Sequence, residues 1–136
     1  MPELKLYSIF ISHAWTYNEE YYRLVEMLKN ASLFNWRNYS VPKHDPLDTT
    51  TDKELEIALY DQIKPTNIVI ILSGMYVNYR KWIQKEIDIA LHYRKPIIGI
   101  KPRGQERIPR EVQDITKEMV GWNTNSIVTA IRKRAI

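Results

Sequence analysis

The chain has 136 residues, 44% of them hydrophobic and 26% charged, which is the balance of a globular protein with one hydrophobic core. It has no cysteine, which excludes disulfides, thiolate zinc sites and a cysteine nucleophile. The formal net charge of +4 arises partly from the C-terminal sequence IRKRAI. This modest excess, read as a solvated basic surface, falls short of the basic stripe with interleaved aromatic residues that indicates nucleic-acid binding.

The sequence also argues against membrane and metal sites. No apolar run approaches the roughly 20 residues of a membrane span. The N-terminal sequence MPELKLYSIFIS lacks the long apolar segment and cleavage site of a secretion signal, so we expect a cytoplasmic protein. His13, His44 and His92 are far apart and match no metal-ligand spacing, so no metal site is expected.

Strands and helices alternate along the chain. Runs rich in β-branched and aromatic residues predict strands at 6–12, 34–41, 67–73, 95–102 and 119–122. The second run is the most polar, which predicts an edge strand, and the third is continuously apolar, which predicts a central one. Capping residues and apolar periodicity predict helices that begin after Asn18, near Thr51, near Lys81, near Pro109 and after a cap at Thr124 or Asn125.

Five such strand–helix units predict an α/β fold of the flavodoxin-like kind. We expect a three-layer single domain over residues 1–136, with a five-stranded parallel sheet of order 2-1-3-4-5 and helices on both faces. Ligands of such sheets bind outside the carboxyl ends of the strands, where strands 1 and 3 diverge. This directs attention to the segments after Ser12 and Ser73, and to the long loop 42–51.

Several common active sites are absent from the sequence. It contains neither GxxxxGK[ST] nor GxGxxG, so the usual phosphate cradles are excluded. It also lacks the GxSxG nucleophile elbow.

The helix KWIQKEIDIAL (81–91) carries a carboxylate in an unusual position. At about 100° per residue, the predicted core stripe consists of Ile83, Ile87, Ala90 and Leu91. Glu86 falls outside the polar face, on a flank with Trp82, Ile89 and Tyr93. A carboxylate partly removed from water is expected to have a raised pKa and to suit the role of site acid, base or charge stabiliser. The alternative is a boundary residue paired with Lys or Arg, with the apolar flank forming a subunit contact.

Two sequence segments resemble a known family. YSIFISHAW is similar to the first-strand motif of TIR domains, and NIVIILSGMYVNYRKWIQKEIDIAL is similar to their third strand and the W-x-x-x-E-I helix that follows. The chain thus resembles bacterial TIR-like proteins, among them the TIR sensor of Thoeris anti-phage defence. The similarity extends over essentially the whole chain.

The resemblance implies an enzyme that cleaves NAD at the nicotinamide–ribose bond, with Glu86 as its catalytic residue. NAD is then the substrate, and no cofactor or metal is needed. The product is an ADP-ribose derivative that activates a separate effector protein. Loss of nicotinamide develops an oxocarbenium-like charge on the ribose, which one carboxylate stabilises.

Further residues are candidate substrate contacts. Phe10, Trp15, Tyr76 and Trp82 are candidates to stack on nicotinamide or adenine. Ser12, His13 and Ser73 are candidates to hydrogen-bond ribose or diphosphate. For His13 the alternative is a loop histidine, and for Trp15 a core or interface residue.

The sequence departs from the family pattern in two places, and rival functions stay open. Ser8 stands where many TIR domains have an acidic residue, and VPKHDP after the second strand lacks the usual glycine. One rival is a non-catalytic TIR-like assembly module, and another is an enzyme like the nucleoside deoxyribosyltransferases. The apolar flank of the helix near Glu86 also indicates self-association into a homo-oligomer.

Overall fold

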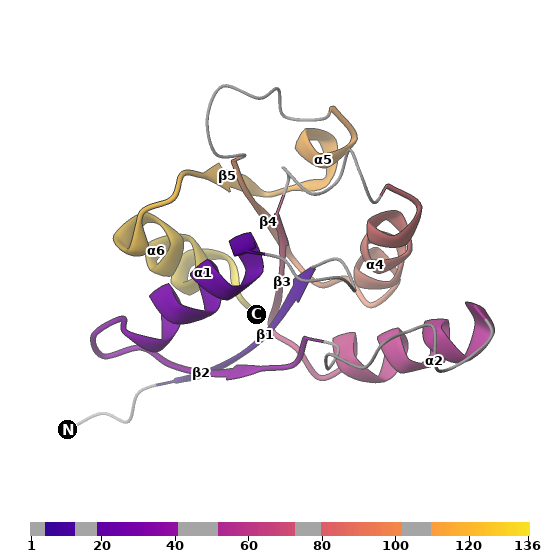
Figure 1. The fold of residues 1–136 in the computed structure, drawn as a ribbon, viewed down its shortest axis with the longest axis horizontal. Coiled ribbons are helices and arrows are strands. Elements are labelled where there is room, and N and C mark those ends of the chain that lie inside the picture. The colour runs from indigo at the N-terminus through magenta and orange to yellow at the C-terminus, as the bar shows by residue number, and fades with distance from the viewer. Residues whose placement is uncertain (1–4, 13–18, 41–51, 73–79, 102–109) are drawn as a thin grey trace.

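A computed structural model describes residues 5–12, 19–40, 52–72, 80–101 and 110–136. Within these ranges the strands form one parallel sheet of order β2-β1-β3-β4-β5 (Figure 1). The strands are β1 (Leu6–Ser12), β2 (Asn35–Asn38), β3 (Ile68–Leu72), β4 (Ile97–Ile100) and β5 (Glu118–Val120). The helices are α1 (Glu19–Lys29), α2 (Asp52–Ile63), α4 (Arg80–His92), α5 (Arg110–Ile115) and α6 (Thr124–Arg134). The predicted flavodoxin-like fold is confirmed.

Helices cover both faces of the sheet, and alternation along the strands divides the core into two layers (Figure 1). On one face, side chains such as Ile9, Ile11 and Ile70 pack with α1 and α6. On the other face, Phe10 and Ile71 pack with α2, α4 and α5. We call the second set the α2/α4 layer; its buried members are Phe10, Leu59, Ile63, Val69, Ile71, Ile83, Ile87, Ile89, Ala90, Ile97 and Val112.

The central strand β3 contributes buried apolar side chains to the cores on both faces of the sheet. All five of its residues are buried, as expected of a parallel strand with helices on both faces. Burying each such Ile or Leu side chain contributes about 1.5–3 kcal/mol to folding. β2, by contrast, is an edge strand with mostly exposed residues, as its polar sequence predicted.

Most of the predicted strands are longer than the observed ones, whereas β1 has the predicted bounds. The second strand ends at Asn38, three residues before the predicted end. The side chain of Asn38 accepts a hydrogen bond from the N–H of Ser40 at 2.9 Å, which forms a bend there. Period and composition locate a strand, but such local side-chain bonds set its end.

The last helix begins at Thr124, one or two residues earlier than predicted. Asn123, in an extended conformation (φ −141°, ψ 124°), is the N-cap, and its side chain accepts the N–H of Ser126 at 3.0 Å. The assignment of the cap to Thr124 or Asn125 was wrong. Three consecutive residues have capping side chains, and the preceding turn decides which of them lies outside the helix.

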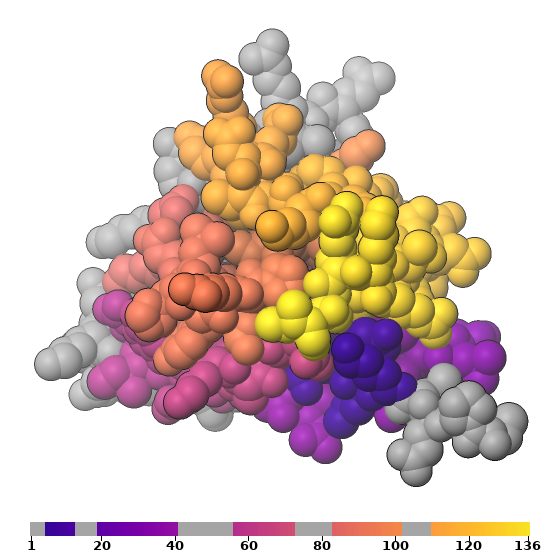
Figure 2. All heavy atoms as spheres, turned by 180° about the vertical axis from the view of Figure 1, so that it is seen from behind, coloured from indigo at the N-terminus to yellow at the C-terminus, as the bar shows by residue number. Residues whose placement is uncertain are grey.

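The C-terminal residues lie beside the first strand. Seen from behind, the residues after α6 (yellow) adjoin the start of β1 (indigo) (Figure 2). Asn67 joins these segments, since its N–H donates to Ser8 O at 2.7 Å and its carbonyl oxygen accepts the N–H of Ile136 at 3.2 Å. Across the described ranges, none of the helices is long and apolar enough to span a membrane.

Candidate active site

Helix α4 buries its acidic residue in the centre of its core stripe. The buried residues Ile83, Glu86, Ile87 and Ala90 follow the i, i+3, i+4, i+7 spacing of one helix face. The prediction that Leu91 completes this stripe was wrong, because Leu91 is 48% exposed. Because Leu91 is apolar, the predicted stripe was centred too close to it. In the structure α4 is rotated so that Glu86 faces the core and Leu91 faces solvent. Glu86 therefore occupies a core position, not the flank of one.

Glu86 is 1% exposed and is the one charged side chain among the buried residues of the described ranges. Desolvating a carboxylate costs several kcal/mol unless its surroundings compensate for the lost water. An apolar residue at this position would avoid that cost and continue the stripe. A buried carboxylate that packing does not require is a candidate for chemistry.

Ser12 lies on the same side of the sheet as Glu86. It is two residues after Phe10, and its register partner on β3 is Ile71, so alternation directs its side chain to the α2/α4 layer. Ile83 and Ile87, which flank Glu86 on α4, belong to that layer too. Ser12 is completely buried, and its Oγ has no hydrogen-bond partner in the described part of the chain.

Ser12 lies where the chain leaves the sheet in opposite directions, and Glu86 is on the helix that follows β3. After β1 the chain continues to α1 on one face, and after β3 it continues to α4 on the other (Figure 1). Ser12 is the last residue of β1 and pairs with the neighbouring strand β3. This divergence of connections between β1 and β3 is the place where such sheets bind ligands.

The other predicted site residues are less well defined. Phe10 is completely buried in the α2/α4 layer, so its stacking on a base stays a prediction. His13, Trp15, Ser73 and Tyr76 lie outside the described residues, as does the loop 42–51. Trp82 is in the first turn of α4, but its side chain is outside the described part.

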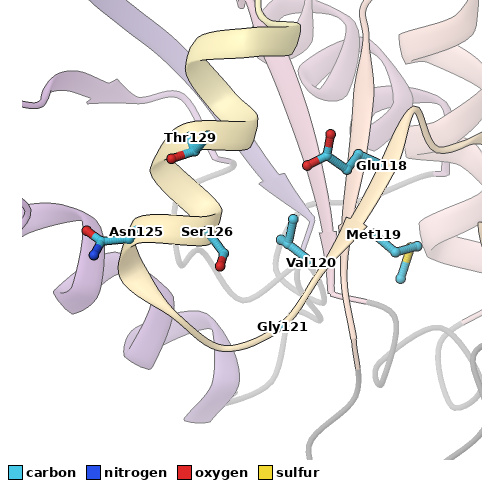
Figure 3. A pocket seen from close by; sticks show the side chains of 7 residues that line it. All are labelled: Glu118, Met119, Val120, Gly121, Asn125, Ser126 and Thr129. Carbon is cyan, nitrogen blue, oxygen red and sulfur yellow. The ribbon is translucent and has the colours of Figure 1, made fainter.

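Two pockets are found on a different side of the molecule, around α6. One, of about 440 Å³, lies between β5 and α6, and its lining includes Glu118 and Val120 of β5 and Ser126 of α6 (Figure 3). The other, of about 300 Å³, lies between α6 and the residues that follow α1. Neither is lined by a predicted site residue. The carboxylate in the first pocket, that of Glu118, is engaged by Arg134 at 3.3 Å and Lys133 at 3.8 Å. The side chain of Glu118 is 29% exposed, so it is held from water far less than that of Glu86 and is the poorer candidate for chemistry.

Among the described residues, Tyr39 and Lys95 have shifted pKa values, and both shifts have local causes. Arg37 donates a hydrogen bond to the hydroxyl of Tyr39 at 3.4 Å, and this bond lowers the pKa of Tyr39. Burial lowers the pKa of Lys95, which lies just before β4 at the opposite edge of the sheet from Ser12. Within the described ranges there is no group of three or more His, Asp or Glu residues that could hold a metal ion.

Sequence reasoning missed one residue at the carboxyl edge of the sheet. Trp122 was assigned to the last strand, but it follows β5, and its indole N–H donates to Lys101 O at 2.9 Å. This bond joins the turn before α6 to the end of β4. No sequence pattern marks such a bond, since it links residues that are 21 positions apart.

The sheet order and helix layers define a flavodoxin-like α/β protein, and the buried glutamate of α4 is consistent with the TIR-like branch of that class. The sequence profile described as "Thoeris protein ThsB, TIR-like domain" matches residues 10–107. The chain therefore belongs to the family of Thoeris ThsB TIR-like domains, as the resemblance of its sequence motifs had indicated.

Structural comparison agrees on the fold. The structure is similar to that of the Clostridium botulinum CMP N-glycosidase BcmB, with 14% sequence identity and a TM-score of 0.50. The superposition covers 93% of this chain and 98% of that one. At this identity the likeness shows a shared fold. A search of curated proteins found no match.

Proposed function

We propose that this protein cleaves NAD at the nicotinamide–ribose bond and converts the remainder into an ADP-ribose-derived signalling nucleotide that activates a separate effector. The observation that carries the proposal is the burial of Glu86 in the core stripe of α4, at 1% exposure. Membership of the Thoeris ThsB family supports it, because the sensor of a defence system needs an output that reaches another protein.

The chemistry needs few protein groups. As the C1′–N bond breaks, its electron pair goes to the pyridine nitrogen, so nicotinamide leaves as a neutral molecule and needs no proton donor. Positive charge develops on the ribose, and the carboxylate of Glu86 stabilises it more strongly in a water-free site than it would in water. Water or a second nucleophile then attacks C1′, and the reaction requires neither metal nor cofactor.

The fold suits this class of reaction. BcmB, a protein of similar fold, is a CMP N-glycosidase, an enzyme that breaks a bond between a ribose and a nitrogen base. The likeness itself concerns the fold alone. It supports the proposal in one respect: a flavodoxin-like sheet is able to hold a nucleotide in position for such a cleavage.

Both site residues are closed to solvent, which affects how the activity must be measured. Glu86 is 1% exposed and Ser12 is fully buried, so substrate reaches them only in a conformation that opens this edge of the sheet. We therefore expect weak activity from the purified protein alone. A trigger present in phage-infected cells, or self-association, would favour the open conformation.

The test is release of nicotinamide from NAD, followed by chromatography, with and without an extract of phage-infected cells. Glu86→Gln keeps the shape of the side chain and removes its charge, so release is expected to vanish while circular dichroism stays the same. Asp88→Asn is the matched control. Asp88 lies on the same helix but is exposed, and its carboxylate accepts a hydrogen bond from Gln84 at 3.0 Å. This control variant is expected to keep the wild-type rate.

Other outcomes separate this proposal from its rivals. Equal release by wild type and Glu86→Gln would remove Glu86 from the reaction. A partner protein bound without NAD, together with no release under any condition, would favour a non-catalytic assembly module. If nicotinamide is released, filtered reaction mixture should activate the effector in the absence of this protein, as a diffusible product requires.

A further inference from the structure

The hydroxyl of Ser12 differs from those of the other buried serine and threonine residues of the described ranges. Ser40 Oγ accepts the backbone N–H of Ile11 at 3.0 Å, and Thr66 Oγ1 donates to Ile63 O at 2.7 Å. Both hydroxyls thus serve the fold. Ser12 Oγ is completely buried and has no partner in the described part of the chain. Buried polar groups are almost always hydrogen-bonded, because leaving one unsatisfied is costly.

The position of Ser12 indicates what completes its hydrogen bonding. It is the last residue of β1, it pairs with Ile71 of β3, and it faces the α2/α4 layer. Glu86 lies between Ile83 and Ile87 of that same layer. The unsatisfied hydroxyl and the buried carboxylate are therefore on one side of the sheet, at the place where ligands of such folds bind.

The surroundings favour a neutral ligand group over an anion. The neighbouring side chains of the layer, such as Phe10, Ile71 and Ile83, are apolar. The charge buried among them is the carboxylate of Glu86. A diphosphate is held by positive charge or by several N–H donors, and these apolar side chains supply neither. A sugar hydroxyl is neutral and both donates and accepts, as a serine hydroxyl does.

We infer that Ser12 Oγ hydrogen-bonds a hydroxyl of the nicotinamide ribose while Glu86 faces the same sugar. This assignment rests on the function proposed above and makes Ser12 a substrate-binding residue that selects ribose. A site built to bond a hydroxyl discriminates strongly against an analogue that lacks it, because the site's own buried group is then left unpaired.

The experiment compares Ser12→Ala with Ser40→Ala. Each variant removes one buried hydroxyl. Ser12 is in β1, and Ser40 bonds the neighbouring residue of that strand, Ile11, so the two changes are made in the same part of the protein. By the inference, the hydroxyl of Ser40 stabilises the fold, whereas that of Ser12 binds the substrate. Steady-state nicotinamide release is measured with NAD and with two analogues whose nicotinamide ribose lacks either the 2′- or the 3′-hydroxyl. The assays contain the phage-infected extract. Thermal denaturation is followed for every variant, with and without NAD.

The expected results differ for the two serines. Ser12→Ala should lower kcat/KM for NAD by at least about tenfold and leave it within about twofold for the analogue that lacks the bonded hydroxyl. Its melting midpoint without NAD should not fall, since no protein bond is lost. Ser40→Ala leaves the N–H of Ile11 unsatisfied, so its midpoint should fall by several degrees. Its kcat/KM for folded protein should stay near that of the wild type.

The outcomes that overturn the inference are separable from those that overturn the proposed function. If Glu86→Gln is inactive while Ser12→Ala has the wild-type kcat/KM, Ser12 is not a ribose contact. An equal loss on NAD and both analogues, or a fall in melting midpoint like that of Ser40→Ala, would assign Ser12 to the fold. If the wild type neither releases nicotinamide nor is stabilised by NAD, both proposals fail. Release that persists in Glu86→Gln would remove Glu86 from the reaction and leave NAD cleavage itself standing, and Ser12 would then be judged by its own variant alone.

Discussion

Asn67 Oδ1 accepts a hydrogen bond from the backbone N–H of Ser8 at 2.8 Å, which joins the residue before β3 to the interior of β1. The nitrogen of the same side-chain amide donates to Ile136 O at 2.9 Å. One side chain thus connects two strands and the residues after α6, at the edge of the sheet remote from Ser12. Its contribution belongs to stability rather than to the proposed chemistry.

We predict that Asn67→Ala lowers the free energy of unfolding by about 1–3 kcal/mol, because the N–H of Ser8 is part-buried and loses its acceptor. Asn67→Asp separates the two bonds, since it keeps the acceptor for Ser8 and removes the donor to Ile136. Asn67→Asp is expected to lower the free energy of unfolding by less than Asn67→Ala does, because the bond to Ile136 is exposed. Urea denaturation followed by circular dichroism measures both values, and a larger loss in the aspartate variant would contradict this order.

Helix α4 ends in a Schellman motif in which glycine is absent. Lys95 N–H donates to Ala90 O at 2.8 Å and Arg94 N–H donates to Leu91 O at 3.0 Å. Arg94 has a φ of 57°, in the left-handed region that costs a residue with a Cβ about 1–2 kcal/mol. Glycine adopts this conformation without that cost, although it loses more freedom on folding.

Arg94→Gly is therefore predicted to raise the free energy of unfolding by about 0.5–1 kcal/mol. The control is the same substitution at Arg23, which is exposed in the middle of α1. There glycine should lower stability by about 1 kcal/mol, because helix interiors disfavour it. Thermal denaturation of the two variants should show shifts of opposite sign. A fall in both would mean that the charge or packing of Arg94 outweighs its backbone strain.

Much of the fold was predictable because it depends on local patterns. The continuous apolar run Ile68–Leu72 required cover on both faces, and alternation with helices required parallel pairing, which together fix the sheet class. The N-cap of α6 was less predictable. Its identity depends on the turn after β5, and that turn is fixed by a bond between Trp122 and Lys101.

The candidate site was predictable to a lesser degree. The helical wheel identified Glu86 because its carboxylate stood among apolar residues. The wheel could not show which side of α4 faces the sheet, because the packing of α4 in the α2/α4 layer determines that. Leu91 was consequently assigned to the core although it is 48% exposed. The missing partner of Ser12 Oγ could not be foreseen at all. It becomes apparent only when the neighbours of β1 are known in three dimensions.

The position of the Glu86 carboxylate, beyond its charge, should limit the rate. Glu86→Asp keeps the charge and withdraws the carboxylate by one methylene, about 1.5 Å. Because a displacement of about 1 Å at a reacting centre reduces the rate roughly 100-fold, we predict a fall in kcat of about that size. The lost methylene should cost about 1 kcal/mol of stability, well short of unfolding the protein. Nicotinamide release in the phage-infected extract, corrected for folded protein by circular dichroism, measures the effect. A rate within twofold of the wild type would mean that the carboxylate acts only through its long-range field, since a diffuse field tolerates such a shift and a direct contact with the ribose does not.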